Sequence, residues 1–217
     1  MFSFGTVMEV LPQLLKGAGA TLMIAAIGIG GGIALGFVVG LTRQYGPRPL
    51  RPVCVVFVEF IRGTPLVVQV MFIYFALPVA LGIRFDPFTA GVVAIVVNAG
   101  AYIAELVRGA FASVDPGLRE AGIAMGLPPG KILAFISAPI ALRRLVPALG
   151  NQVIISLKDT SLLIVIGVAE LTRTGQEIMA VNFRSLEVWT AVALIYLAIT
   201  LSLSGLLRLI ERKARIL

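Results

Sequence analysis

Two pairs of charged residues lie at depth in long apolar stretches of the chain. Glu59 and Arg62 fall in one stretch, and Lys158 and Asp159 fall in another. A charge at the centre of a bilayer costs at least about 2.5–3.5 kcal/mol on insertion scales, so it normally faces protein or water and marks a transport pathway. Such a set offers a cation for a carboxylate and an anion for an ammonium. Alternatively, Glu59 and Arg62 neutralise each other, because residues three apart share one helix face.

Interrupted helices are expected close to these charges. Pro65 follows Gly63 and Thr64 and removes a backbone donor, which predicts a kink, although an ordinary packed kink would explain Pro65 equally well. Opened helices expose N–H and C=O groups that can hold a zwitterion. In the hypothesis, Arg62 or Lys158 meets an α-carboxylate and Asp159 meets an α-ammonium. The predicted substrate site comprises Glu59, Arg62, Asn98, Lys158, Asp159, Thr160 and Ser161.

The composition indicates that membrane helices carry these groups. Of 217 residues, 59% are hydrophobic and 13% are charged, and the mean hydropathy is +1.01. Soluble domains carry about 25% charged residues. Without histidine, and with Cys54 as the one cysteine, the chain has neither an internal disulfide nor histidine-ligated haem or zinc, and we expect no cofactor. The net charge of +7 is read as a topology signal and not as nucleic-acid binding.

About five spans are expected in this all-α, single-domain protein of residues 1–217. The apolar segments cover about 17–41, 53–80, 88–110, 146–171 and 188–209, and a long amphipathic connection covers 113–144. In the first segment, glycines recur every fourth residue at Gly28, Gly32, Gly36 and Gly40. This ladder predicts close approach of a second helix.

Basic residues predict the orientation of the spans. If the N-terminus is outside, twelve Lys and Arg residues fall on one side of the membrane and four on the other. Positive residues concentrate on the cytoplasmic side. The count therefore places the N-terminus outside and both the long connection and the C-terminus in the cytoplasm.

The stretch R-E-A-G-I-A-M-G-L, which contains Glu120, Ala121, Gly122 and Gly126, predicts a short cytoplasmic helix with a smooth surface. Such a helix can dock in the groove of a partner. The nearest approach to a nucleotide-binding loop, G-L-P-P-G-K-I, has the wrong spacing and ends in Ile instead of Ser or Thr. The chain is therefore not expected to be an enzyme, and any ATP hydrolysis belongs to a separate subunit.

The pattern E-A-G-x-x-x-G-x(9)-I-x-A-P, from Glu120 to Pro139, resembles the E-A-A loop of ABC-importer permeases. Gly122 and Ala138 depart from that loop mildly. The segments V-E-F-I-R-G-T-P-L-V-V-Q, G-A-Y-I-A-E-L-V-R-G and S-L-K-D-T-S-L-L are similar to permeases for histidine, arginine and glutamine, and the glutamine permeases of bacteria are the most similar. The resemblance spans nearly the whole chain and is weakest over the first 50 residues.

This resemblance implies the ABC type I importer permease fold, with residues 113–139 as the coupling loop. It also implies a homodimer in the bacterial inner membrane, two cytoplasmic ABC ATPase subunits, and an external amino-acid-binding protein. The expected function is import of a polar L-amino acid, with glutamine indicated. An ion-coupled secondary transporter or channel would accommodate the intramembrane charges equally well, but it would need no ATPase.

Overall fold

A computed structural model describes residues 2–215, which form helices and loops and contain no strand. The α-helices are α1 (Phe4–Tyr45), α2 (Leu50–Arg62), α3 (Leu66–Met71), α4 (Leu77–Leu81), α5 (Pro87–Ala112), α6 (Pro116–Ala124), α7 (Pro129–Ile132), α8 (Ala138–Asp159), α9 (Leu171–Asn182) and α10 (Ser185–Arg215). Two π-helical turns, Phe72–Ala76 and Leu133–Ser137, and a 3₁₀ segment, Thr160–Ile166, join some of them. The all-α class is confirmed.

The expected number of spans is also confirmed. Among the described residues, four helical segments are long and apolar enough to cross a membrane: Phe4–Tyr45, Pro87–Ala112, Pro129–Ile166 and Ser185–Arg212. A fifth arises if Leu50–Arg62 and Leu66–Leu81 count together, but these two pieces meet at 106°. The interruption predicted at Pro65 is therefore present, and it is a sharp break between α2 and α3 instead of a mild kink.

Other boundaries differ from the expectation for local reasons. The helix before the fourth span begins at Pro129, inside the segment predicted as a connection, because prolines suit the first turn of a helix. Arg144 then lies within α8, where its guanidinium donates to the backbone carbonyl of Ser113. The sequence also gave no indication of α9, whose N-terminus is capped by the buried carboxylate of Glu170.

The most extensive helix contact in the described chain is between α1 and α5, and glycines make it possible. A Cβ atom added to Gly36 would lie 2.6 Å from the Ile103 side chain and 2.9 Å from the Gly100 carbonyl oxygen. Added Cβ atoms at Gly28, Gly32 and Gly40 would also meet α5 at 2.6–2.8 Å. The prediction that this ladder serves close helix packing is confirmed.

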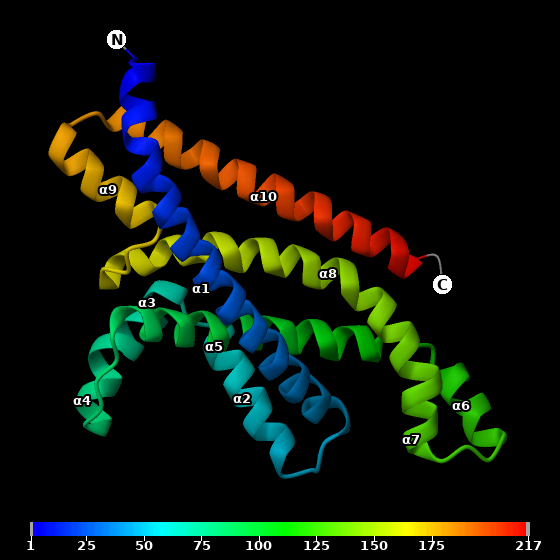
Figure 1. Ribbon diagram of the computed structural model, residues 1–217. Coiled ribbons are helices and arrows are strands. Elements are labelled where there is room, and N and C mark those ends of the chain that lie inside the picture. The colour runs from blue at the N-terminus through cyan, green and yellow to red at the C-terminus, as the bar shows by residue number, and fades with distance from the viewer. Residues whose placement is uncertain (1, 216–217) are drawn as a thin grey trace.

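The helices cross as long, inclined rods, and the two ends of the molecule differ (Figure 1). The N-terminus, α9 and α4 lie on the left of the view. The hairpin of α6 and α7 and the C-terminal end of α10 lie on the right. The two ends of the chain are thus far apart, and the α6–α7 hairpin is at the same end as the C-terminus.

Candidate functional site

A partly polar cavity of about 620 Å³ lies where α2 breaks from α3, against α5 and α8. Its lining comprises Arg62, Gly63, Thr64, Pro65, Leu66, Asn98, Tyr102, Gln152, Ile155 and Asp159. A larger hollow of about 760 Å³, between α1, α8 and α10, is lined by apolar side chains and Ser202. The smaller cavity is the candidate site, because it brings together a cation, an anion and neutral amides.

Gln69 holds the break between α2 and α3 in place. Its side-chain amide nitrogen donates to the carbonyl oxygens of Ile61 at 2.7 Å and Thr64 at 3.0 Å. The Thr64 hydroxyl donates to the Phe60 carbonyl oxygen at 3.0 Å. The break frees carbonyl groups that the regular helix would have bonded, and these two side chains satisfy them, as a non-helical segment at membrane depth requires.

Asn98 is held against the same break from α5. Its side-chain nitrogen donates to the Gln69 side-chain oxygen at 3.0 Å, and both amides are buried. Sequence reasoning placed Asn98 in the site but missed Gln69. The sequence did contain a signal for Gln69, which is a single glutamine in an apolar run shortly after a proline. An amide buried in such a run must find hydrogen-bond partners.

Asp159 is the last residue of α8, just before the helix tightens into the 3₁₀ segment. At this transition the Thr160 hydroxyl donates to the Leu157 carbonyl oxygen and the Ser161 hydroxyl to the Lys158 carbonyl oxygen, both at 2.7 Å. The two hydroxyl protons are thereby directed to backbone carbonyl oxygens where the α-helix ends.

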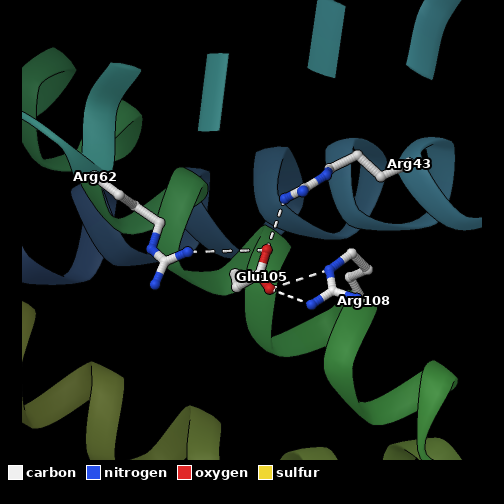
Figure 2. Close-up of polar contacts among 4 residues, drawn as sticks. All are labelled: Arg43, Arg62, Glu105 and Arg108. Carbon is white, nitrogen blue, oxygen red and sulfur yellow. Dashed lines mark hydrogen bonds and ion pairs between the residues drawn. The ribbon is translucent and has the colours of Figure 1, made fainter. Parts of the chain in front are cut away.

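Arg62 enters the cavity from the end of α2, and its guanidinium carbon lies 5.5 Å from the centre of the Tyr102 ring. Its Nη1 atom is 3.9 Å from the Glu105 carboxylate. Figure 2 shows that carboxylate between Arg62 on one side and Arg43 and Arg108 on the other. Among the described ion pairs, Arg62 is not paired with Glu59. The alternative of mutual neutralisation is therefore wrong, because α5 supplies a nearer carboxylate.

The structure brings three of the seven predicted residues to the cavity, namely Arg62, Asn98 and Asp159. The other four are outside its lining: Glu59 and Lys158 have exposed side chains, Thr160 is buried, and Ser161 is partly buried. Tyr102 and Gln152 line the cavity and were not foreseen. The cavity therefore offers a guanidinium and a carboxylate for the charged ends of a zwitterion, and amides and a phenol for a neutral polar group.

The predicted docking segment is a separate, exposed feature. Asp115 caps α6, and Gly126 ends it with a φ of 76°, the left-handed conformation that glycine tolerates best. The backbone nitrogens of Gly126 and Leu127 bond back to the carbonyl oxygens of Ile123 and Gly122, a Schellman arrangement. Gly122 is buried, and an added Cβ atom would lie 3.1 Å from both Ile132 and Ile136. Glu120, Ala121, Ile123 and Met125 are exposed.

Comparison with known proteins identifies the family of this chain. Residues 28–216 match the family described as "Binding-protein-dependent transport system inner membrane component". The chain belongs to this family. It is therefore the membrane subunit of a binding-protein-dependent importer and spans the inner membrane several times.

Individual relatives cover almost the whole permease. It is 55% identical to the glutamine transport system permease protein GlnP of Escherichia coli (strain K12), over 100% of this chain and 99% of the relative. It is 33% identical to the arginine transport system permease protein ArtQ of Bacillus subtilis (strain 168), over 98% and 97%. A solved structure described as an amino acid ABC transporter with histidines matches at a TM-score of 0.92 and 34% identity, over 98% of this chain and 99% of that one. The ABC type I importer permease fold is confirmed.

Proposed function

We propose that this permease carries a polar L-amino acid, glutamine in the first instance, through the cavity at the α2–α3 break. The observation that carries the proposal is that Arg62 and Asp159 line one cavity together with Asn98 and Gln152. The 55% identity to a glutamine permease over the full chain supports the choice of glutamine. Membership of a binding-protein-dependent family favours an ATP-driven importer over an ion-coupled one.

In the proposed complex, Arg62 binds the α-carboxylate and Asp159 binds the α-ammonium. Arg62 is preferred to Lys158 because its guanidinium lines the cavity, and a guanidinium matches a carboxylate with two parallel donors. Asn98 and Gln152 offer amide groups to a carboxamide side chain, because an amide both donates and accepts. Charges at the two ends and neutral groups elsewhere favour a zwitterion with an uncharged side chain.

The test compares Arg62→Gln with Lys158→Gln in the permease reconstituted with its ATPase and its binding protein. We expect Arg62→Gln and Asp159→Asn to lower glutamine uptake at least about tenfold, because each leaves one charged end of the substrate unpaired. Lys158→Gln should retain most of the uptake. The assignment of the carboxylate would be overturned if Lys158→Gln abolished uptake and Arg62→Gln did not.

We further propose that α6 is the coupling helix, with Glu120, Ala121, Gly122 and Gly126 as its key residues. Exposed Ile123 and Met125 provide apolar surface for a groove on the ATPase, while buried Gly122 lets α6 pack against the following helix. The transporter would then move α6 with the ATPase as nucleotide binds and leaves.

Gly126→Ala tests this role, because it forces a side chain into a left-handed conformation at a cost of about 1–2 kcal/mol. Open space surrounds Gly126, so the change creates no clash. We expect ATP hydrolysis to continue while glutamine-dependent stimulation falls. Gly130→Ala, also in open space but without the positive φ, is the matched control. Equal coupling in both variants would contradict the role of Gly126.

The proposed assembly contains two copies of this permease, two ATPase subunits and an external binding protein, with the N-terminus outside and the C-terminus in the cytoplasm. The basic residues of the sequence and the separation of the two chain ends support this orientation. Replacing Cys54 by Ser gives a background without cysteine in which single cysteines can be labelled. A membrane-impermeant maleimide should label Gly82→Cys in intact cells and leave Gly130→Cys unlabelled; the reverse pattern would invert the topology.

A further inference from the structure

One carboxylate, that of Glu105 on α5, is shared by three guanidinium groups next to the cavity (Figure 2). Its Oε2 atom accepts from Arg43 Nη1 at 2.7 Å. Its Oε1 atom accepts from Arg108 Nε at 3.0 Å and also from Arg108 Nη2. The Arg62 Nη1 atom is 3.9 Å from Oε2, beyond hydrogen-bond distance. The carboxylate therefore holds two arginines firmly and the third weakly.

The weakly held arginine is the one that reaches the cavity. Arg62 and Arg108 each have 37% of the side chain exposed and Arg43 has 11%, but of the three it is Arg62 that lines the cavity. Neither Arg43 nor Arg108 lines the cavity. Because both oxygens of Glu105 already accept hydrogen bonds from other arginines, Glu105 attracts Arg62 only weakly. Arg62 is thus placed between a carboxylate of the protein and the space where a second carboxylate would bind.

We infer that Glu105 is a positioning residue that competes with the substrate carboxylate for Arg62, and that Arg43 and Arg108 set the strength of this competition. This inference rests on the proposed function, in which Arg62 binds the α-carboxylate. In the empty cavity, Glu105 attracts Arg62 weakly and orients it over Tyr102. When substrate enters, its carboxylate replaces Glu105 as the nearer partner. The competition weakens binding enough for substrate to leave, as a transporter requires.

The first test is Glu105→Gln, which removes the charge and keeps the shape. The probe is radiolabelled L-glutamine, bound at equilibrium to the purified permease–ATPase complex in lipid nanodiscs without the binding protein. We expect the Kd for glutamine to fall about two- to five-fold, the range of a partly exposed ion pair. L-glutaminamide, which has no carboxylate, should show no such gain. Tighter binding is a result that simple loss of structure does not produce.

The second test is Arg108→Gln, which releases Oε1 of Glu105 to bind Arg62 more strongly. We expect the Kd for glutamine to rise by a similar factor, opposite in direction to Glu105→Gln. Glu105→Asp, which keeps the charge, should be closer to the wild-type Kd than Glu105→Gln. If Glu105→Gln does not fold, the rise in Arg108→Gln and its absence for L-glutaminamide test the same competition.

Failure of this inference is distinguishable from failure of the proposed function. If Arg62→Gln abolishes glutamine binding but neither Glu105→Gln nor Arg108→Gln changes the Kd in the expected direction, the competition is overturned and the site stands. If Arg62→Gln binds glutamine normally, the site itself is overturned. In the double variant Arg62→Gln/Glu105→Gln, the gain from Glu105→Gln should disappear; a persistent gain would also overturn the competition.

Discussion

The α1–α5 contact and the α2–α3 break are neighbouring regions of this protein. They accommodate the backbone inside the apolar membrane in opposite ways. At the α1–α5 contact, glycines remove side chains so that two intact helices meet at backbone distance. At the break, the backbone departs from the helix, and Gln69 and Thr64 bond the freed carbonyls. The α1–α5 contact, which frames the molecule, therefore depends on missing side chains. The polar site at the break depends instead on side chains that bond an opened backbone.

Gly36→Leu should have the largest effect, because the added side chain would push α1 and α5 apart. The added atoms would meet the Ile103 side chain and the Gly100 carbonyl oxygen at less than 3 Å, and the backbone there cannot give way. The cost should reach or exceed the about 1–3 kcal/mol typical of overpacking. We expect little folded protein in the membrane fraction. Gly19→Leu, in the same helix and in open space, is the control; equal loss in both variants would refute the role of the ladder.

Gln69→Leu should have an intermediate effect, because it leaves the opened backbone unsatisfied. Ile61 and Asn98 would each lose a buried hydrogen bond, and Thr64 would lose a partly buried one. An unsatisfied buried group costs about 1–3 kcal/mol, so we expect a lower midpoint of thermal unfolding in detergent. Exposed Gln13 of α1 provides the matched control, Gln13→Leu. A Gln69→Leu protein as stable as this control would mean that Gln69 does not hold the break.

Pro65→Ala should have the smallest effect and shows which residue maintains the break. Pro65 stands before α3 in an extended conformation, with φ −64° and ψ 140°. If Gln69 holds the break, the substitution should cost less than about 1 kcal/mol, chiefly through added freedom of the unfolded chain. Uptake of glutamine should remain near that of the wild type. A loss of stability larger than that of Gln69→Leu would show that the proline itself maintains the bend.

Part of the candidate site could be predicted from the sequence, and there is a physical reason why the rest could not. Arg62, Asn98 and Asp159 were found because depth along a helix follows from position in the chain. Lys158 and Asp159 were both expected in the site as charges at similar depth, yet Asp159 lines the cavity and Lys158 does not. Depth does not specify rotation about the helix axis, which is fixed by the helices that pack against it.

The sequence by itself determined that this chain is a bundle of about five membrane helices with a glycine-packed face and a short helix in the connection before the fourth span. These features depend on composition and on local spacing, which the chain carries without reference to its fold. Only the tertiary structure decided that Glu105, and not Glu59, is the partner of Arg62, and that the helix break is a bend of 106°. Pairing across helices depends on contacts between residues distant in sequence, and no local pattern encodes which of several carboxylates comes nearest.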